Sequence, residues 1–581
     1  MTYVPPLDDL RFLLTRVFDL NDLKTMFAEQ GFDEDLAFAL LEEAGKFSAA
    51  VLAPLNLLGD EAGTKLENGT VITAPGFASA YKSYAEAGWC GLSAAPELGG
   101  QGLPHTMQVL VDEMVSGANI SFGLFPGLTR GASEAIAAHA DEALKQTYLP
   151  KMVSGEWTGV MALTESHAGT DLGLLRTRAV PKNDGSYSVT GTKIFISSGD
   201  HDFGGNIVHL VLARLPDAPA GVKGISLFLV PKFLVSADGH LGPRNGVTVG
   251  TLEHKMGIHA QPTCVINYDG ATGWLVGAPN HGIAAMFTMM NAERLFVGLQ
   301  GLGIAYHAYL KAAAYAKDRL QSRAPNDGPS PSPIIAHPDV RRMLLTIRAF
   351  VEAGRALAIW TALQIDISRH HAEEVARGKA EALVSLLTPV IKASFTDFGF
   401  ESAVLAQQVF GGHGYVRESG MEQFVRDARI TQIYEGTNGV QALDLVARKL
   451  LLEGGALVHD FFDLVAGELA ASRNAGGIDD IATPVEQALE RLRGVTKIVQ
   501  EHTTDAAEVG AASANYLRLF ALVCFGWMWT RMAAAAQQDA LEAKRAVALF
   551  FTSRVLQETL GLETAIRAGA APVMRLPAEE F

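Results

Sequence analysis

Residues 429–439 of this 581-residue chain read RITQIYEGTNG. One carboxylate, Glu435, interrupts an apolar run and is followed by a glycine and a threonine. A carboxylate in a poorly solvated pocket has a raised pKa and can act as a general base, and an adjacent glycine lets a ligand approach the backbone. The alternative is a helix-capping loop that exposes Glu435. The stretch itself is compatible with both.

A second motif, FGGHGY at residues 410–415, lies about twenty residues earlier, at the end of an apolar helical pattern. Its three glycines expose backbone amides that can hold a phosphate or another polar group. A glycine-rich turn alone is weak evidence. The turn follows a helix and not a strand, and no Rossmann fingerprint accompanies it, so a classical dinucleotide-binding fold is not expected.

Two further segments complete the pattern, MALTESHAGTD at residues 161–171 and KIFISS at residues 193–198. Together the four motifs resemble the acyl-CoA dehydrogenase family of flavoproteins, in the family's order and with compatible spacing. The resemblance runs from about residue 44 to residue 450. Two positions depart from the usual motifs, since Thr170 replaces a serine and Phe195 stands where a tryptophan is common.

The periodicity of the chain predicts a mainly α protein with a central β domain, similar in layout to the acyl-CoA dehydrogenases. Apolar residues recur with a helical period up to about residue 158. They then alternate with period two in β-branched segments up to about residue 280, and the helical period returns after that. We expect an N-terminal helical domain at 1–158, a β domain at 159–280, a C-terminal helical bundle at 281–451 and an additional helical domain at 452–581. A proline-rich stretch at 324–333 predicts an exposed loop.

The resemblance implies noncovalent FAD, extended between the β domain and the C-terminal helices, with its adenosine part reaching a neighbouring subunit. We therefore expect a homodimer or a homotetramer. The residues implied to contact FAD are Met161, Leu163, Thr164, Thr170, Phe195, Ser197, Arg319, Gln408, Gly412 and Thr437. Arg319 departs from the family pattern in the residues that follow it, and the alternative for Phe195 is a place in the core of the β domain.

The family's chemistry assigns Glu435 as the base that removes the proton α to the thioester carbonyl, while hydride leaves the β carbon. Glu293 is a rival, because some branches of the family place the base on the equivalent helix; otherwise Glu293 is expected to pair with a cation such as Arg294 or to face solvent. The residues expected to contact the substrate are Thr170, Asn291, Arg294, Tyr434 and Arg448. For Arg448, a solvated charge at a helix C-terminus is an equal alternative.

The charge and cysteine content of the chain limit the ligands and partners that it is expected to bind. The formal charge of −16 offers no basic field for nucleic acid or an anionic membrane. Cys90, Cys264 and Cys524 lack metal-binding spacing, so we expect three buried thiols and no metal site. The N-terminus shows no signal or transit pattern, which predicts a cytoplasmic protein.

The apolar run 519–530 is too short for a membrane span and predicts a core helix. The alternative is that its Phe525, Trp527 and Trp529 touch a membrane surface without stable insertion.

The resemblance therefore implies conversion of an acyl-CoA thioester to the trans-2-enoyl-CoA, with electron-transfer flavoprotein as the electron acceptor. The C-terminal extension resembles that of long bacterial members. The acyl group stays open between 3-(methylthio)propanoyl and medium or long fatty acyl chains. Two other functions are an acyl-CoA oxidase, which passes electrons to oxygen, and a non-catalytic binding protein on the same fold.

Overall fold

The computed structural model describes residues 3–236, 238–325, 331–474, 476–538 and 541–581, and these fold into two compact units. The sheet unit comprises Lys46–Gln108 and Ala118–Phe296. The helical unit comprises Met1–Gly45, Val109–Gly117 and Val297–Phe581. Three helices contribute residues to both units, namely α3 (Glu34–Phe47), α6 (His105–Ala118) and α9 (Gly282–Asp318).

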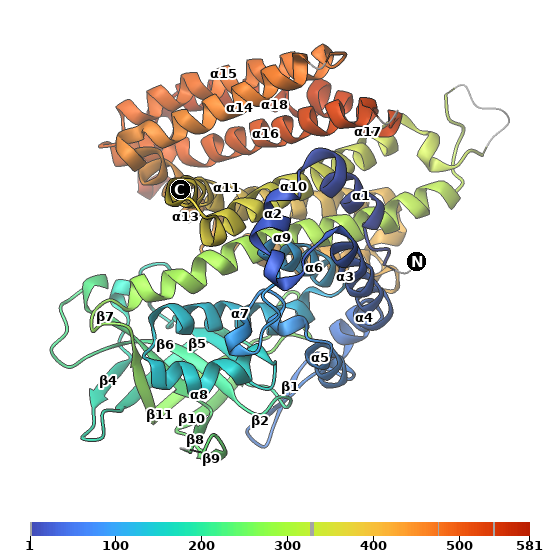
Figure 1. Ribbon diagram of the computed structural model, residues 1–581. Helices are drawn as coiled ribbons and strands as arrows, with labels where there is room; N and C mark the ends of the chain where they lie inside the picture. The colour runs from blue at the N-terminus through green and yellow to red at the C-terminus, as the bar shows by residue number, and fades with distance from the viewer. Residues whose placement is uncertain (1–2, 237, 326–330, 475, 539–540) are drawn as a thin grey trace. The chain divides into compact units, whose positions relative to one another are not determined.

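The sheet unit is built around a seven-stranded sheet (Figure 1). Its strands are β3 (Thr158–Ala162), β4 (Arg178–Pro181), β5 (Tyr187–Ser197), β6 (Ile207–Arg214), β7 (Ile225–Pro231), β10 (Val247–Leu252) and β11 (Thr263–Val276). The order is β10-β11-β5-β4-β6-β3, and β7 pairs with both β11 and β6. Two hairpins accompany the sheet, β1 (Lys65–Glu67) with β2 (Thr70–Ile72) and β8 (Phe233–Val235) with β9 (Leu241–Arg244).

Both faces of this sheet are covered, as the period-two pattern of β6 shows. Val208 and Leu210 belong to one buried cluster, which includes Ile136 of α7 (Ile120–His139) and Leu149 of α8 (Glu142–Val153). Val211 points to the opposite face and belongs to a second cluster with residues of β5 and β11. Successive side chains of a strand point to opposite faces, so β6 carries apolar side chains on both faces, with His209 and Arg214 as its two polar residues. The unit also contains α4 (Ala53–Ala62) and α5 (Phe77–Glu86).

The helical unit consists of α-helices that range from four residues in α19 to 37 in α11. Before the extension they are α1 (Leu7–Phe12), α2 (Asn21–Met26), α10 (Pro338–His370), α11 (Glu374–Phe410), α12 (Met421–Thr431) and α13 (Asn438–Ala447). The extension contains α14 (Ala456–Asn474), α15 (Asp479–Glu501), α16 (Ala506–Gln538), α17 (Glu542–Phe550), α18 (Glu558–Arg567) and α19 (Ala571–Met574). In the extension, α14 and α15 run alongside α16 (Figure 1).

The predicted fold class is confirmed: along the chain, helices precede and follow a β region that starts at Thr158 and ends at Val276. The sequence patterns missed the β1–β2 hairpin, whose strands have only three residues each. Of the proline-rich stretch, residues 326–330 lie outside the described residues. The four domain boundaries stay a prediction.

Helix α16 is a core helix of the helical unit, as its apolar run predicts. Trp527 and Trp529 are fully buried, and Phe525 is 1% exposed, so the membrane-surface alternative is wrong. The Trp527 indole N–H donates to Glu468 at 2.7 Å, and that of Trp529 donates to the Ala349 carbonyl at 3.0 Å. Within the described residues, 374–415 and 506–537 are long and apolar enough to cross a membrane, but 67% and 89% of their most apolar windows are buried.

Buried ionic groups join four helices of the helical unit. Arg355 of α10, 1% exposed, contacts both Glu113 of α6, at 2.5 Å, and Asp9 of α1. Lys544 of α17 also contacts Asp9 and lies 2.8 Å from Glu352 of α10. Burial opposes ionisation of Asp9, but the charges of Lys544 and Arg355 hold its pKa below the ordinary value. This network therefore fixes the extension against the first helix of the chain.

We predict that Arg355→Met lowers the stability of the protein by about 3–5 kcal/mol, because Asp9 and Glu113 would lose a buried cation. Thermal unfolding followed by circular dichroism measures the change. The control is Arg473→Met, which removes an arginine whose ion pairs with Asp479 and Glu486 are partly exposed and should change stability by no more than about 1 kcal/mol. Equal midpoints for the two variants would contradict the prediction.

Candidate active site

Glu435 lies in a short loop of the helical unit, between α12 and α13. Its φ is +57°, and the next residue, Gly436, has a φ of +84°. Glycine adopts such angles freely, whereas a glutamate held there stores about 1–3 kcal/mol of strain. Glu435 is half-buried, so the alternative of a fully exposed capping residue is wrong. Its raised pKa stays a prediction.

The residues around Glu435 are fixed by hydrogen bonds. The Tyr434 hydroxyl donates to the Gln300 side chain of α9. The Thr437 hydroxyl donates to the Gln432 carbonyl at 3.2 Å, and the Gln441 amide donates to the Gly436 carbonyl at 3.1 Å. The backbone on both sides of Glu435 is therefore held, and Tyr434 is turned toward α9.

The glycine-rich turn follows the end of α11, as predicted, and its Gly412 is exposed. Phe410, the last residue of α11, stacks on Tyr315 of α9 with ring centroids 4.1 Å apart. Gln408 is exposed two residues before the motif. Arg319 is exposed just after α9, where its carbonyl accepts from the Ile334 N–H at 2.8 Å. These three residues, which were predicted to contact FAD, are thus accessible.

In the sheet unit, a buried ion pair joins the two predicted flavin segments. Lys193 of β5 is fully buried, and its ammonium lies 2.9 Å from a Glu165 oxygen and donates to the Leu163 carbonyl at 2.8 Å. The Ile194 N–H donates to the Thr164 carbonyl at 2.9 Å. Leu163 and Thr164 are thereby placed beside β5.

The surroundings favour the charged form of Glu165 and disfavour that of Lys193. Burial opposes ionisation of Glu165, but the Lys193 charge and the Thr177 hydroxyl lower its pKa to about 2. The hydroxyl and the backbone N–H of Thr177 donate to Glu165 at 2.6 Å and 3.0 Å. Burial lowers the pKa of Lys193 to about 8. Both groups are therefore charged near neutral pH.

Phe195 is 59% exposed, so the alternative that placed it in the core of the β domain is wrong. Its φ is +60°, an angle that a phenylalanine rarely adopts. Half-buried Ser197 lies two residues further along the same strand. An exposed aromatic face with nearby hydroxyls and backbone amides fits a planar ring that has a polar edge, as FAD does.

The remaining flavin-motif residues follow β3. Met161 is half-buried within this strand. Ala168 and Glu165 exchange two backbone hydrogen bonds of 3.0 Å, which close a tight turn. Thr170 is exposed after that turn, and the Asp171 carboxylate accepts from the Gly173 N–H at 3.0 Å. The loop therefore presents the Thr170 hydroxyl to solvent.

The rival acid, Glu293, is 3% exposed within α9, so the expectation that it faces solvent is wrong. It packs against α7, where a Cβ added to Gly131 would lie 2.7 Å from a Glu293 oxygen. Arg294 donates to the Asn291 side chain at 3.3 Å and lies 5.8 Å from the ring centre of Phe287. Arg294 is buried and Asn291 is exposed.

Arg448 follows α13, with its side chain 66% exposed. It lies 3.2 Å from Asp444, one helical turn earlier. This arrangement fits a solvated charge at the helix C-terminus. Contact with CoA stays a prediction for Arg448.

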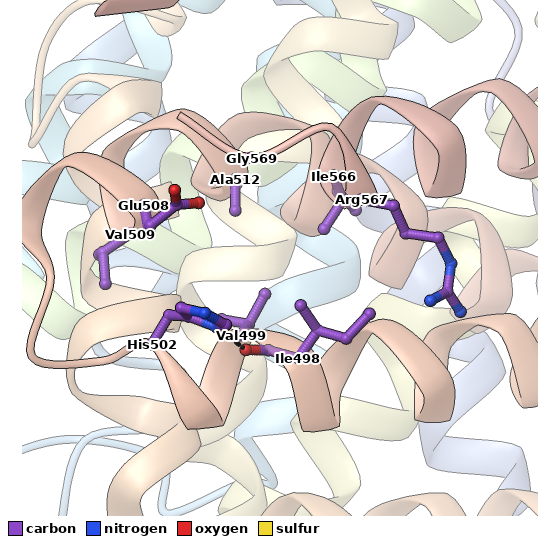
Figure 2. Close-up of a pocket in the computed structure, with 9 residues that line it drawn as sticks. All are labelled: Ile498, Val499, His502, Glu508, Val509, Ala512, Ile566, Arg567 and Gly569. Atoms are coloured by element: carbon purple, nitrogen blue, oxygen red, sulfur yellow. Dashed lines mark hydrogen bonds between the residues drawn. The ribbon is translucent and has the colours of Figure 1, made fainter. Parts of the chain in front are cut away.

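A pocket of about 210 Å³ lies in the extension (Figure 2). It is lined by Ile498, Val499, His502, Glu508, Val509, Ala512, Ile566, Arg567 and Gly569, none of which belongs to the predicted site. Glu508 accepts from the Ala570 N–H at 3.0 Å, and Arg567 donates to Glu563 at 2.9 Å. The charged groups at this pocket are thus engaged by the chain's own residues.

The sequence predicted three buried thiols and no metal site. All three cysteines are free; Cys264 and Cys524 are buried, whereas Cys90 is partly exposed and corrects the expectation of three buried thiols. Over the part of the chain that the structure describes, no group of three or more His, Cys, Asp or Glu side chains is arranged to hold a metal.

Comparison with known protein families accounts for almost the whole chain. Residues 38–156 match the acyl-CoA dehydrogenase N-terminal domain, 160–271 the middle domain, 280–451 the C-terminal domain and 457–577 the acetyl-CoA dehydrogenase C-terminal-like domain. The chain belongs to the acyl-CoA dehydrogenase family. It is an oxidoreductase, and the family's cofactor is FAD, as the motifs implied.

Two curated relatives match over nearly their full length. The chain is 43% identical to 3-methylmercaptopropionyl-CoA dehydrogenase of Ruegeria pomeroyi, covering 96% of this chain and 97% of the relative. It is 34% identical to a butyryl-CoA dehydrogenase of Syntrophomonas wolfei, covering 100% and 99%. The crystal structure of Caenorhabditis elegans ACDH-11 in complex with C11-CoA superposes with a TM-score of 0.78 at 20% identity, covering 95% of this chain and 91% of that chain, which supports the fold.

Several residues of this acyl-CoA dehydrogenase that shape the site carried no predicted role. Lys193 and Glu165 lay inside the quoted motifs, and a lysine within a strand of apolar alternation was the available signal. Gln300 and Asp397, which bind the loop of Glu435, lie 134 and 41 residues from their partners in sequence. No local pattern could connect them.

We predict that Lys193→Met weakens FAD binding by about 10- to 100-fold, because Glu165 and the Leu163 carbonyl lose the donor that holds both flavin segments together. Flavin fluorescence during dilution measures the dissociation constant. Lys182→Met is the control, since Lys182 is exposed and donates only at the surface, to Thr272 at 2.9 Å. Wild-type affinity in the Lys193 variant would refute this role.

Proposed function

We propose that the protein catalyses FAD-dependent α,β-dehydrogenation of a short acyl-CoA thioester to the trans-2-enoyl-CoA. The observation that carries the proposal is the 43% identity, over 96% of the chain, to a relative named 3-methylmercaptopropionyl-CoA dehydrogenase. The intact Tyr434–Glu435–Gly436 loop supports catalysis over a purely binding role.

In this proposal, Glu435 removes the α proton of the thioester. The half-buried position of Glu435 restricts water and favours a carboxylate that can act as a base. Its backbone N–H donates to the thioester carbonyl, so that the enolate-like charge meets a donor already in place. When bound, FAD supplies the acceptor for the hydride that leaves the β carbon.

We assign the other site residues by the same proposal. Leu163, Thr164, Thr170, Phe195 and Ser197 border the flavin ring. Arg319, Gln408, Gly412 and Thr437 hold the rest of FAD, and Met161 supports the ring from β3. Tyr434, Asn291, Arg294, Arg448 and Thr170 contact the substrate.

The proposed acyl group is 3-(methylthio)propanoyl. This group has the same number of chain atoms as pentanoyl, with a thioether sulfur in place of one methylene. The butyryl-CoA dehydrogenase that matches at 34% identity makes a short linear acyl group the second candidate. We also propose a cytoplasmic homodimer or homotetramer that passes electrons to electron-transfer flavoprotein.

The substrate prediction is tested by anaerobic turnover with electron-transfer flavoprotein or a dye as acceptor. We expect kcat/KM for 3-(methylthio)propanoyl-CoA to equal or exceed that for butanoyl-, pentanoyl-, octanoyl- and palmitoyl-CoA, with octanoyl- and palmitoyl-CoA at least about 10-fold lower, since each mismatched methylene changes binding by roughly 1–3 kcal/mol. A preference for palmitoyl-CoA would overturn the short-chain assignment. In a parallel aerobic assay without these acceptors, faster turnover with oxygen than with the acceptors would indicate an oxidase.

The choice of base is tested by replacing each acid with its amide. Glu435→Gln keeps size and hydrogen bonding but removes basicity, so flavin reduction by acyl-CoA should slow by about 10²- to 10⁴-fold. Glu293→Gln, the matched control, should slow it far less. Stopped-flow absorbance of the bound flavin gives both rates. Loss of reduction in the Glu293 variant alone would move the base to α9, and loss in both would indicate a coupled pair.

A further inference from the structure

One carboxylate of α11 binds both ends of the loop that carries Glu435. Oδ1 of Asp397 accepts from the Gln432 side-chain amide at 2.6 Å and from the Asn438 side-chain amide at 2.7 Å. Hydrogen bonds to an ionised acceptor are about twice as strong as neutral ones. Asp397 is half-buried, which shields these bonds from water.

Each of the two amides is also fixed at its oxygen. Arg429 donates to the Gln432 side-chain oxygen at 3.1 Å. The ammonium of fully buried Lys392 donates to the Asn438 side-chain oxygen at 2.9 Å. With a cation at each oxygen, the nitrogen of each amide is directed toward Asp397.

These two anchors close a small loop. The Asn438 N–H donates to the Gln432 carbonyl at 3.1 Å, so the ends of the loop meet. Glu435 lies midway between them, with its φ of +57°. A strained residue keeps such an angle only where its surroundings fix it, and here the two ends are tied to one point on α11.

We propose that Asp397 is a positioning residue that holds Glu435 for proton removal by clamping Gln432 and Asn438. This rests on the proposed role of Glu435 as the base. Asp397 acts through the loop and touches no reacting atom. A displacement of a catalytic group by about 1 Å can cost roughly 10²-fold in rate.

The test compares two replacements of Asp397 in the FAD-loaded enzyme. Asp397→Leu removes, at similar size, the oxygen that accepts both hydrogen bonds. We expect flavin reduction by acyl-CoA to slow about 10- to 100-fold while the concentration of acyl-CoA for half-maximal reduction changes by less than about 3-fold. Asp397→Asn keeps an oxygen that both amides can reach, and should recover most of the rate. Wild-type reduction in Asp397→Leu would overturn the proposal, as would equal slowing in both variants.

Glu401→Gln is the control for general effects on α11. Glu401 lies one turn beyond Asp397 and pairs with Arg518 at 2.7 Å, away from the loop. Its amide variant should reduce at the wild-type rate; slowing equal to that of Asp397→Leu would show a helix-wide effect and reject positioning. If Asp397→Leu does not fold, Gln432→Met removes one arm of the clamp and must itself slow reduction for the proposal to stand.

A double variant separates positioning from the assignment of the base. If Asp397 acts through Glu435, then Glu435→Gln with Asp397→Leu should be no slower than Glu435→Gln alone, because the group being positioned is already inactive. Multiplied losses would reject positioning while leaving the base in place. Near-wild-type reduction in Glu435→Gln alone would instead refute the proposed base, whatever Asp397 does.

Discussion

The close crossing of α9 and α11 is the constraint on which the catalytic loop depends. A Cβ at Gly301 of α9 would lie 2.5 Å from the Phe395 carbonyl oxygen, and one at Gly399 of α11 would lie 2.6 Å from the Gly301 carbonyl oxygen. The two backbones are thus in direct contact, which only glycine permits. Gln300 and Asp397, which bind the loop of Glu435, lie beside these glycines in sequence. A wider crossing would separate the two supports of the loop.

In both units, buried charged side chains fix the positions of neighbouring segments more than they stabilise the fold. Moving an ion pair from water into the interior costs several kcal/mol for each ion, and the attraction repays this only with additional hydrogen bonds. Glu165 meets that condition, since Lys193, Thr177 and the Arg176 N–H all bind it. The result is a fixed separation between two segments, one carrying exposed Thr170 and the other exposed Phe195. Asp397 follows the same principle with amide donors in place of a cation.

The sequence predicted features that repeat locally and missed those that depend on tertiary contact. The short β-branched and apolar run at 207–212 predicted a strand, found as β6, and the helical period beyond residue 281 predicted the helix found as α9. The motifs that the chain shares with the family predicted FAD as the cofactor. Phe195 was harder, since neither its φ of +60° nor its exposure follows from its place in a β-rich pattern. The burial of Glu293 depends on Gly131, which lies more than 160 residues earlier.

The backbone conformations of Glu293 and Glu435 distinguish these two candidate bases independently of the sequence motif around Glu435. Glu293 belongs to a regular stretch of α9, where any good helix former fits. Glu435 occupies a left-handed angle that favours glycine or asparagine, and the chain holds a glutamate there against that preference. Such strain persists only when the surrounding structure maintains it, and Asp397, Gln432 and Asn438 provide that structure. A network that holds one carboxylate in a costly conformation is understandable if that carboxylate has to be in one place when the proton leaves the substrate.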